Sequence, residues 1–387
     1  MAKLGEVCTI VSGSTPKTSV TSYWDGNIKW ITPAELNEDT FYIMDSVRHI
    51  TEEGKEKTGL SYLPTGTVIL SSRAPIGKTA IAGCEMCCNQ GFKNLICSDA
   101  IYNEYLYFFL KSKTDYLNSL GRGATFKEIS KSIVESIEIP LPEVNQQKEI
   151  AEKFKKLEQL ISLRKQQLAK LDELVKARFV EMFGDPADNV NNLPASPMTA
   201  ICQIIDGDRG KNYPKQEEFS DSGFCLFLNA KNVTAQGFSF ENCTYITEEK
   251  DALLRNGKLC RGDVVLTTRG TIGNLAFYDT SVPYENIRIN SGMVILRMNK
   301  QVVSEIFFIE QFKMQLDSIK SRIASGSAQP QLPISTMNKI EMILPPLELQ
   351  NQFAAFVERV SQQKQTVQQS LEKLELMKKA LMQEYFG

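Results

Sequence analysis

The chain repeats one long segment of its own sequence. Residues 121–184 align without gaps with residues 324–387. From position 142 onward, identical pairs include Pro142/Pro345, Gln147/Gln350, Ala151/Ala354, Leu168/Leu371, Leu171/Leu374, Lys176/Lys379, Ala177/Ala380, Glu181/Glu384, Phe183/Phe386 and Gly184/Gly387. A repeat of this length predicts two structural units of one kind, each ending in the same element.

A weaker similarity precedes the repeated tails, at a slightly different spacing. Residues 66–77 (GTVILSSRAPIG) resemble residues 262–273 (GDVVLTTRGTIG), and Asn89-Gln90-Gly91 resembles Asn290-Ser291-Gly292. Each half is therefore predicted to hold a diverged domain followed by a better preserved tail. The stretch 185–197 is rich in Pro and Asn, which is typical of a loop and here links the halves.

The upstream part of each half has the pattern of a mixed α/β domain. Short β-branched runs are separated by Gly, Pro and Asn, which indicates strands. These runs lie at 67–70, 133–139, 264–268 and 293–296. Residues 102–120 and their counterpart, residues 305–323, are each expected to form one helix.

The repeated tails have the pattern of long helices. After Pro142 and after Pro345-Pro346, no Gly or Pro occurs before Phe183 and Phe386, respectively. Each tail therefore predicts one helix of about 37 residues, roughly 55 Å long at the usual rise per residue. A helix of this length needs a partner that covers its apolar stripe.

The heptad spacing of apolar residues indicates that the two tails cover each other's apolar stripes. Each tail contains one uninterrupted apolar row at seven-residue intervals. The rows are Phe154, Ile161, Leu168, Val175 and Met182 in the first tail, and Phe353, Val360, Val367, Leu374 and Leu381 in the second. Charge placement in the neighbouring rows allows either orientation, but copies related by a twofold axis across the helices must be antiparallel. The rows therefore predict an antiparallel coiled coil.

The predicted fold is α+β, with two similar mixed α/β domains joined by two long helices in a pseudo-twofold arrangement. The expected domains are residues 1–141, helix 142–184, residues 185–344 and helix 345–387. An ordinary coiled-coil dimerisation element is the alternative. That alternative does not explain why two divergent domains flank the pair so regularly.

Composition limits the classes of function. The sequence has no apolar run long enough to span a membrane, and its start lacks an export signal, so we expect a cytoplasmic protein. Cys84, Cys87 and Cys88 contain one C-x2-C spacing, but a structural zinc site needs four ligands and only the distant Cys97 could supply the fourth, so no metal is expected. The net charge of −2 is unfavourable for a DNA-binding protein. Basic residues must then gather on one surface, or a partner must supply positive charge.

Motifs of catalysis are missing from the sequence. Ile76-Gly77-Lys78-Thr79 ends like a phosphate-binding loop, but Ser72 stands where that motif needs its first glycine. Leu347 follows Pro345-Pro346, where an adenine methyltransferase motif would have an aromatic residue, and His49 is the only histidine. We therefore expect a binding protein without catalytic residues or a cofactor of its own.

Two similar domains on a rigid spacer are suited to reading two separated sites. Features on one face of DNA recur about every 34–36 Å, one helical turn, so a spacer of roughly 55 Å can place two domains at successive major grooves. Nearly identical tails with divergent domains indicate a fixed spacer that carries independently varied domains. The target would then be two different short half-sequences.

Short motifs in both halves resemble the specificity subunits of type I restriction-modification systems. In the first half they are residues 4–7 (LGEV), 13–16 (GSTP) and 30–34 (WITPA); in the second half they are 205–214 (IDGDRGKNYP) and 288–293 (RINSGM). The helix entries, 139–142 (IPLP) with Gln146-Gln147 and 344–348 (LPPLE) with Gln350, resemble the shared regions of that family. The resemblance covers the whole chain in order.

This resemblance implies the partners and the division of labour. Each globular domain would be a target recognition domain for double-stranded DNA. The paired tails would dock two methyltransferase subunits, which carry S-adenosylmethionine and methylate adenine in each half-site. ATP-dependent restriction subunits would add cleavage. Two alternatives remain: the recognition chain of a related bipartite restriction-modification enzyme outside type I, or a coiled-coil scaffold that does not bind DNA.

The candidate DNA contacts lie in loops beside the repeated motifs. Base edges are read by side chains that donate and accept hydrogen bonds, whereas Lys, Arg, Ser and Thr also position phosphates. The candidates are Ser14, Thr15, Lys17, Tyr23, Arg73, Lys78, Asn89 and Gln90 in the first domain, and Arg209, Lys211, Asn212, Tyr213, Lys231, Asn232, Arg269, Asn274 and Arg288 in the second. Arg73 and Arg269 occupy equivalent places, after a strand and before a glycine turn. An arginine that bonds loop carbonyls is the structural alternative.

We predict that Arg269→Ala weakens specific DNA binding tenfold or more, because a bidentate arginine–guanine pair discriminates by about 1–3 kcal/mol. The measurement is the dissociation constant of the assembled complex for its target. An unchanged constant would remove Arg269 from the candidates.

Overall fold

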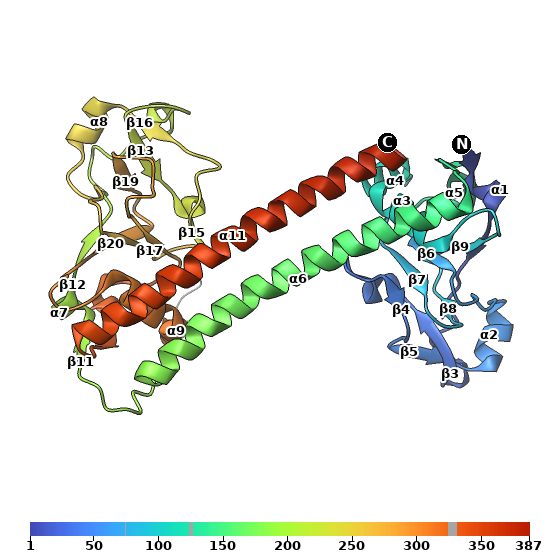
Figure 1. The fold of residues 1–387 in the computed structure, drawn as a ribbon, viewed down its shortest axis with the longest axis horizontal. Helices are drawn as coiled ribbons and strands as arrows, with labels where there is room; N and C mark the ends of the chain where they lie inside the picture. The colour runs from blue at the N-terminus through green and yellow to red at the C-terminus, as the bar shows by residue number, and fades with distance from the viewer. Residues whose placement is uncertain (74, 124–126, 324–330) are drawn as a thin grey trace. The chain divides into compact units, whose positions relative to one another are not determined.

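The computed structural model describes residues 1–73, 75–123, 127–323 and 331–387. The chain divides into two compact units: unit 1 is Met1–Gln166 with Gln368–Gly387, and unit 2 is Gln167–Val367. Two long helices, α6 (Val144–Phe183) and α11 (Leu347–Phe386), each contribute one segment to each unit (Figure 1). No helix in the described part of the chain is long and apolar enough to cross a membrane.

Unit 1 contains a main sheet of strand order β2-β9-β6-β7-β4 and a smaller sheet of order β5-β3-β8, with β1 paired to β10. The strands are β1 (Ala2–Lys3), β2 (Cys8–Ser12), β3 (Trp24–Ile31), β4 (Tyr42–Ile43), β5 (Arg48–Ile50), β6 (Val68–Ser71), β7 (Thr79–Ala82), β8 (Cys87–Cys88), β9 (Phe92–Cys97) and β10 (Glu138–Ile139). The helices are α1 (Leu4–Val7), η1 (Thr21–Tyr23), η2 (Pro33–Glu35), α2 (Glu52–Thr58), α3 (Asn103–Ser112), α4 (Thr114–Leu120) and α5 (Lys131–Ser136).

Unit 2 contains a main sheet of order β12-β20-β17-β18 and a smaller sheet of order β16-β13-β19, with the pairs β11–β21 and β14–β15. The strands are β11 (Ala195–Pro197), β12 (Cys202–Asp206), β13 (Cys225–Leu228), β14 (Val233–Thr234), β15 (Gly237–Phe238), β16 (Tyr245–Ile246), β17 (Val264–Thr267), β18 (Leu275–Phe277), β19 (Ile287–Ile289), β20 (Met293–Met298) and β21 (Glu341–Ile343). The helices are α7 (Met198–Ile201), η3 (Gln216–Glu218), η4 (Ala230–Asn232), α8 (Glu248–Leu253), α9 (Glu305–Ile323) and α10 (Ile334–Met337).

The two units have one framework. In the main sheets, β2, β9, β6 and β7 of unit 1 correspond in order and direction to β12, β20, β17 and β18 of unit 2. In the small sheets, an antiparallel neighbour (β5 or β16) and a parallel neighbour (β8 or β19) flank the central strand. The prediction of two similar mixed α/β domains is therefore confirmed.

Two expectations about local structure were wrong. The run 133–139 contains a helical turn, α5, before the short strand β10, because Ser130 caps the helix by accepting a hydrogen bond from the Ile133 N–H at 3.3 Å. Residues 102–120 form two helices instead of one. The break lies at Lys113, where the Thr114 hydroxyl donates to the Lys111 carbonyl at 3.0 Å. The counterpart in unit 2, α9, is one continuous helix.

In both units, a helix that follows the main sheet packs against the long helices. In unit 1, Phe154 of α6 stacks on Phe386 of α11 with a centroid distance of 5.6 Å, and Phe386 also contacts Tyr105 and Phe109 of α3. All four side chains are essentially inaccessible to solvent. The last helical residue of α11 is therefore part of the core of unit 1.

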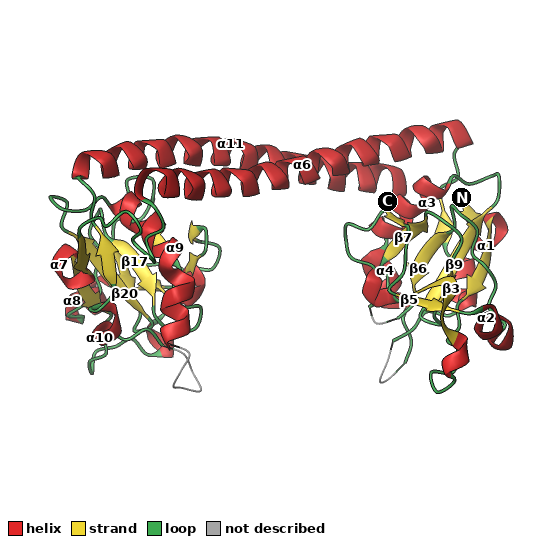
Figure 2. Cartoon of the chain, turned by 90° about the horizontal axis from the view of Figure 1, so that it is seen from below, coloured by secondary structure: helices red, strands yellow, loops and turns green. Residues whose placement is uncertain are grey.

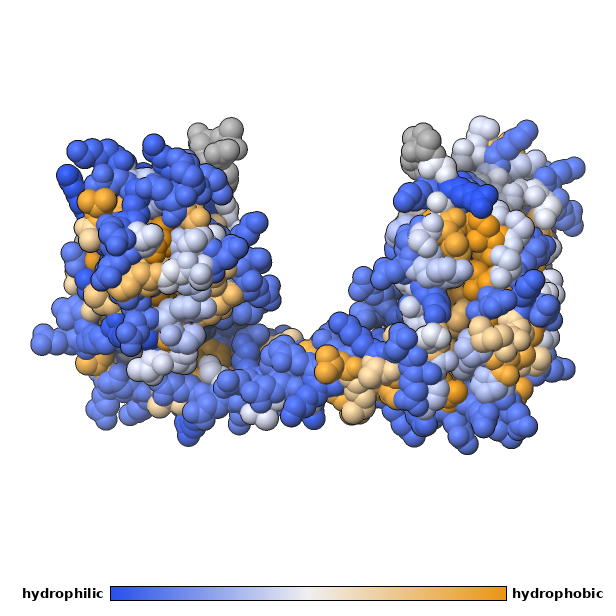
Figure 3. Space-filling view, turned by 90° about the horizontal axis from the view of Figure 1, so that it is seen from above, coloured by the Kyte–Doolittle hydropathy of each residue, from blue (hydrophilic) through white to orange (hydrophobic). Residues whose placement is uncertain are grey.

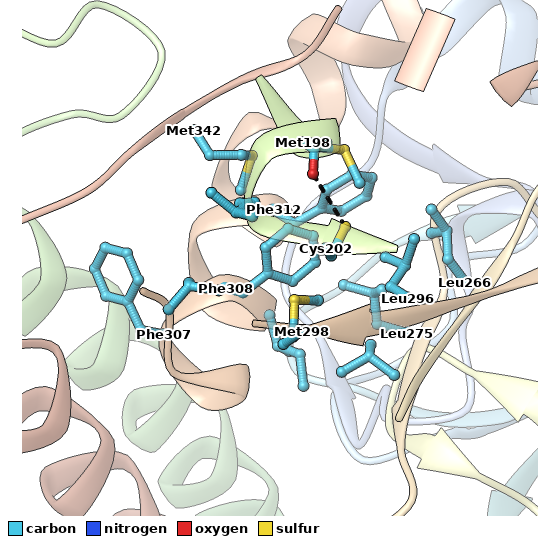
Figure 4. Packing of buried hydrophobic residues seen from close by; sticks show 14 of the residues in the cluster. Met198, Cys202, Leu266, Leu275, Leu296, Met298, Phe307, Phe308, Phe312 and Met342 are labelled. Atoms are coloured by element: carbon cyan, nitrogen blue, oxygen red, sulfur yellow. Dashed lines mark hydrogen bonds between the residues drawn. The ribbon is translucent and has the colours of Figure 1, made fainter. Parts of the chain in front are cut away.

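The same arrangement recurs in unit 2 with the helices exchanged. Phe183, the last residue of α6, contacts Phe307 of α9 and Phe353 of α11 at 5.1 and 5.7 Å. Figure 4 shows Phe308 and Phe312 of α9 among the side chains of the sheet, whereas Phe307 points away from them. Consecutive residues of α9 point in directions about 100° apart, so Phe308 faces the sheet while Phe307 faces the long helices.

Contacts within each unit show that the long helices run antiparallel. Residue numbers rise along α6 while those of their partners fall along α11. In unit 1 the pairs are Lys153–Tyr385, Glu158–Lys378 and Lys165–Glu375; in unit 2 they are Asp172–Lys364 and Phe179–Phe353. The predicted antiparallel coiled coil is confirmed. Of the predicted pairing residues, Phe154, Ile161, Val175, Phe353, Val360 and Val367 are buried, and Leu168, Met182, Leu374 and Leu381 are half-buried.

We predict that Phe386→Ala destabilises unit 1 and that Phe183→Ala destabilises unit 2, each by about 3–5 kcal/mol, the usual cost of truncating a buried phenylalanine. Amide hydrogen exchange resolved by peptide measures the loss separately in each unit. Leu376→Ala is the matched control because Leu376 is 71% exposed on α11. Equal loss of protection in both units with either variant would contradict the assignment.

Candidate nucleic-acid interface

Three loops meet at one end of the main sheet of unit 1. They follow β2, follow β6 and precede β9. The Ser72 N–H donates to the Gly91 carbonyl at 2.7 Å, and the Ser14 N–H donates to the Cys88 carbonyl at 3.0 Å. The Thr15 hydroxyl bonds the Gln90 side chain. These hydrogen bonds bring together the loops that carry Ser14, Thr15, Arg73, Asn89 and Gln90 of the predicted group.

Unit 2 holds the equivalent loops in the same way. The Thr268 N–H donates to the Gly292 carbonyl at 2.9 Å, as Ser72 does to Gly91. The Asn290 side chain accepts from the Gly292 N–H at 2.9 Å, and Asn89 accepts from Gly91 at 2.8 Å. One framework therefore supports both sets of loops.

A glycine fixes the closest approach of these loops in each unit. A Cβ atom at Gly13 would lie 1.9 Å from the Asn89 carbonyl oxygen, and one at Gly207 would lie 2.3 Å from that of Asn290. No side chain fits at such distances. Gly13 and Gly207 are therefore required at equivalent places, where the strand leaves the sheet and enters the loop.

The basic residues of these loops differ in how they are held. Arg73 is half-buried and lies 3.9 Å from the Glu128 carboxylate, which also accepts from the buried Lys93 at 3.1 Å. Arg209 is paired with Asp206 at 3.1 Å. Arg269 is exposed, and no acidic side chain of the described residues pairs with it. Its guanidinium is therefore the most available of the three for an anionic or hydrogen-bonding ligand.

Other predicted contacts lie at or near the surface of the two units. Lys17, Gln90, Lys211 and Lys231 are exposed, whereas Ser14, Thr15, Asn89 and Asn212 are half-buried. The Asn212 side chain donates to the Leu253 carbonyl at 3.1 Å, so one of its polar atoms is already used. These residues remain predictions as DNA contacts.

Two predicted contacts are buried structural residues, and we correct their assignment. Arg288 is 5% exposed; its guanidinium donates to the Asp251 carboxylate and to the carbonyls of Asp251, Leu254 and Asn256. Asn232 is 1% exposed and its side chain donates to the carbonyls of Ser239 and Asn242, which follow β15. Their donors are consumed inside the domain, which sequence alone does not reveal.

Four further candidates have side chains that point inward. Lys78 donates from Nζ to the carbonyls of Pro33 and Leu36 at 3.1 and 2.6 Å, and Asn274 donates to the Val233 carbonyl at 2.9 Å. Tyr23 and Tyr213 pack against hydrophobic clusters. The structural alternative, side chains that bond loop carbonyls, describes Lys78 and Asn274.

Arg288 forms a cluster of charged side chains with Asp251 and Lys258. Burial alone would raise the pKa of Asp251, but hydrogen bonds from Lys258, at 2.6 Å, and from Arg288 lower it below the usual value. The Asp251 carboxylate therefore stays ionised at neutral pH. It anchors α8 to β19, beside the loops that carry the candidate contacts.

A pair of glutamines was missed as a functional feature. The Gln147 side chain accepts from the Tyr102 N–H at 2.8 Å and donates to the carbonyls of Ala100 and Pro142 at 3.0 and 2.8 Å. It is fully buried.

Gln350 repeats these bonds in unit 2. It accepts from the Ser304 N–H at 3.0 Å and donates to the carbonyls of Val302 and Pro345 at 3.1 and 2.8 Å. Each glutamine thus ties the start of a long helix to the segment that precedes α3 or α9. The identity of the two residues in the repeat was the available signal, but their burial was not evident from the sequence.

Duplicated domains on shared helices, each presenting an equivalent but chemically different loop surface, define a two-domain recognition protein. The chain belongs to the family described as the type I restriction modification DNA specificity domain, whose model matches residues 1–173 and 198–376. The expected family is therefore shown.

Named relatives agree with this membership. The chain is 29% identical, over 92% of its length and 85% of the relative's, to the type I restriction enzyme MjaIX specificity subunit of Methanocaldococcus jannaschii. It is 26% identical to the EcoR124I/EcoR124II specificity subunit of Escherichia coli, over 41% of this chain and 40% of the relative.

Solved structures share the fold. A type I restriction-modification S subunit from M. genitalium matches with a TM-score of 0.57 and 18% identity, covering 100% of this chain and 95% of that one. A chain from a study of the assembly and conformational transition of the type I system matches with a TM-score of 0.62 and 17% identity, covering 100% and 96%.

We predict that Gln350→Met lowers the stability of unit 2 by about 1–3 kcal/mol, because the Ser304 N–H and the carbonyls of Val302 and Pro345 lose their buried partner. Hydrogen exchange at the start of α9 and urea unfolding measure the effect. Gln352→Met, at an exposed position of the same helix, is the control. Equal stability of the two variants would contradict a clamping role.

Proposed function

We propose that the chain is the DNA-recognition subunit of a type I restriction-modification complex and that each domain reads one half of a bipartite target. One observation carries this proposal: equivalent loop junctions present different side chains on one framework. Gln90 of unit 1 corresponds to Ser291 of unit 2. Glu128 forms a backbone β-bridge with Arg73, and Gln331 forms the equivalent β-bridge with Arg269. Different polar groups at equivalent places favour different half-sites.

The charge of the chain fits a subunit that acts inside a complex. Affinity for duplex DNA depends on cations that neutralise phosphates, and the net charge of this chain is −2. Exposed lysines such as Lys17, Lys211 and Lys231 supply some phosphate contacts. We expect the isolated chain to bind DNA weakly and in a salt-sensitive way, and the partner subunits to complete the basic surface.

The paired helices serve as spacer and as docking surface. In unit 1, Leu160, Leu163, Leu376 and Met377 of these helices are 45–71% exposed, and in unit 2 Leu174, Val180 and Leu349 are 38–46% exposed. The space-filling view shows a small hydrophobic group on the surface of the helical segment (Figure 3). Exposed aliphatic groups on helices favour a protein partner. Because each unit exposes such a set, the surface fits two methyltransferase subunits.

In this proposal the chain itself recognises the target sequence. Adenine methylation with S-adenosylmethionine belongs to the methyltransferase subunits, and ATP-dependent cleavage belongs to the restriction subunits. Support comes from the names of the relatives, which are specificity subunits. The subunit contributes no catalytic group to either reaction.

The test exchanges residues 1–141 for the first domain of a specificity subunit with another target and maps methylated adenines in cells that carry the whole system. We predict a split motif in which only one half changes, because each domain has its own core and its own loops. Exchange of residues 185–344 is the matched experiment and changes the other half. A scaffold that does not contact DNA would leave the motif unaltered, and a change in both halves would contradict independent reading.

A further inference from the structure

Two tryptophans of β3 hold the loop that follows β2. Trp24 and Trp30 pack edge to face with centroids 5.1 Å apart, and both are largely buried. The Trp30 indole N–H donates to the Ser14 carbonyl at 3.0 Å, and the Trp24 indole N–H donates to the Lys17 carbonyl at 3.2 Å. The indole pair therefore lies directly beside one of the three loops of the candidate interface.

An arginine covers this indole pair on its solvent side. Arg48 lies opposite Trp30 in the register of β3 and β5, so their side chains share one face of the small sheet. The guanidinium carbon lies 3.6 Å from the centroid of the Trp24 ring and 5.6 Å from that of Trp30. Arg48 is exposed, and its side chain forms no ion pair or hydrogen bond with the residues that the structure describes. β3 and β5 lie away from α6 in this unit (Figure 2).

Stacking prepares the guanidinium for a planar ligand. The aromatic faces restrain the arginine side chain, while the N–H groups at its edge stay unpaired. An unpaired, restrained guanidinium donates two parallel hydrogen bonds to guanine O6 and N7 in the major groove at a smaller ordering cost than a freely moving side chain. Lysine lacks both the fork and the flat face.

The equivalent place in unit 2 is chemically different. Trp30 corresponds to Phe227, because each is the last but one residue of its strand. Trp30 pairs with the parallel strand β8, and Phe227 pairs with the equivalent strand β19. The residue across from Phe227 is Thr244. The Phe227 N–H donates to the Thr244 carbonyl at 2.8 Å, and the Thr244 hydroxyl donates to the Phe227 carbonyl at 3.2 Å. The arginine is therefore a feature of the first domain alone, as expected for a residue that sets one half-site.

We propose that Arg48 is a specificity-determining residue that reads a guanine in the half-site of the first domain. The inference rests on the proposed function, since it assigns one residue of the same interface. The neighbouring loop offers neutral hydrogen-bonding groups, Ser14 and Thr15, which suit base edges, while Lys17 is the exposed cation of that loop and suits a phosphate. Arg48 was not among the candidates from the sequence, because only the folded sheet brings it onto the two tryptophans.

The alternative role for Arg48 is to cover the hydrophobic cluster around Trp24. Arg48→Met separates the two roles, because a methionine side chain still packs on the indole but has no N–H to donate. Arg48→Lys keeps the charge and removes the fork. Lys57→Met, at an exposed cation on α2 in the same unit, is the matched control for charge.

The experiment uses the specificity chain assembled with the methyltransferase subunit of its own system, after methylation mapping has given the target. Dissociation constants are measured for the target duplex and for duplexes with single base-pair changes in each half. We expect Arg48→Met and Arg48→Lys to weaken target binding roughly tenfold or more and to abolish discrimination at one G·C pair of the first half. Discrimination in the second half and the melting temperature stay as in the parent complex, and Lys57→Met has little effect.

Two results overturn the inference. If the Arg48→Met complex binds and discriminates like the parent complex, Arg48 only covers the hydrophobic cluster around Trp24. A loss that is uniform across all sequences, with a shallower salt dependence, makes Arg48 a phosphate contact instead of a base reader. A parent complex that recognises no split target contradicts the proposed function itself and is thereby distinguished from a failure of Arg48 alone.

Discussion

The burial of the C-terminal end of each long helix is the interaction on which the rest of the structure depends. Phe386 ends α11, a helix that begins in unit 2, yet its ring lies in the core of unit 1 against Phe154 and Tyr105. Phe183 ends α6, which begins in unit 1, and lies in the core of unit 2. Neither core is complete without the helix that starts in the other unit. Antiparallel pairing is therefore built into the stability of both domains.

This construction separates what must stay the same from what can vary. The paired helices, the glutamine clamps Gln147 and Gln350, and the glycines at 13 and 207 hold the framework at equivalent places in both units. Loop side chains such as those of Lys17, Gln90, Lys211 and Arg269 are exposed and lie outside either core. A domain can therefore change the sequence that it reads without losing the support of the helices.

The sequence predicted those features that depend on periodicity along the chain. The long helices were evident because no Gly or Pro interrupts them and because their apolar rows repeat every seven residues. Features that depend on contacts between distant segments were not evident. Arg288 looked like a loop arginine but bonds Asp251, which is 37 residues away, and Arg48 becomes notable only where β5 meets β3. The helical turn at 131–136 was missed because β-branched residues and a serine cap favour different structures.

Zero-length carbodiimide cross-linking of the chain, followed by mass spectrometry, tests the antiparallel pairing most directly, because it joins a lysine to a carboxylate that already contacts it. We expect amide links Glu158–Lys378 and Lys165–Glu375 in unit 1 and Asp172–Lys364 in unit 2, whose ion pairs span 2.7, 3.7 and 2.5 Å. Links between equivalent positions of the repeat, such as Lys155–Glu358, would show that the two long helices pair in parallel.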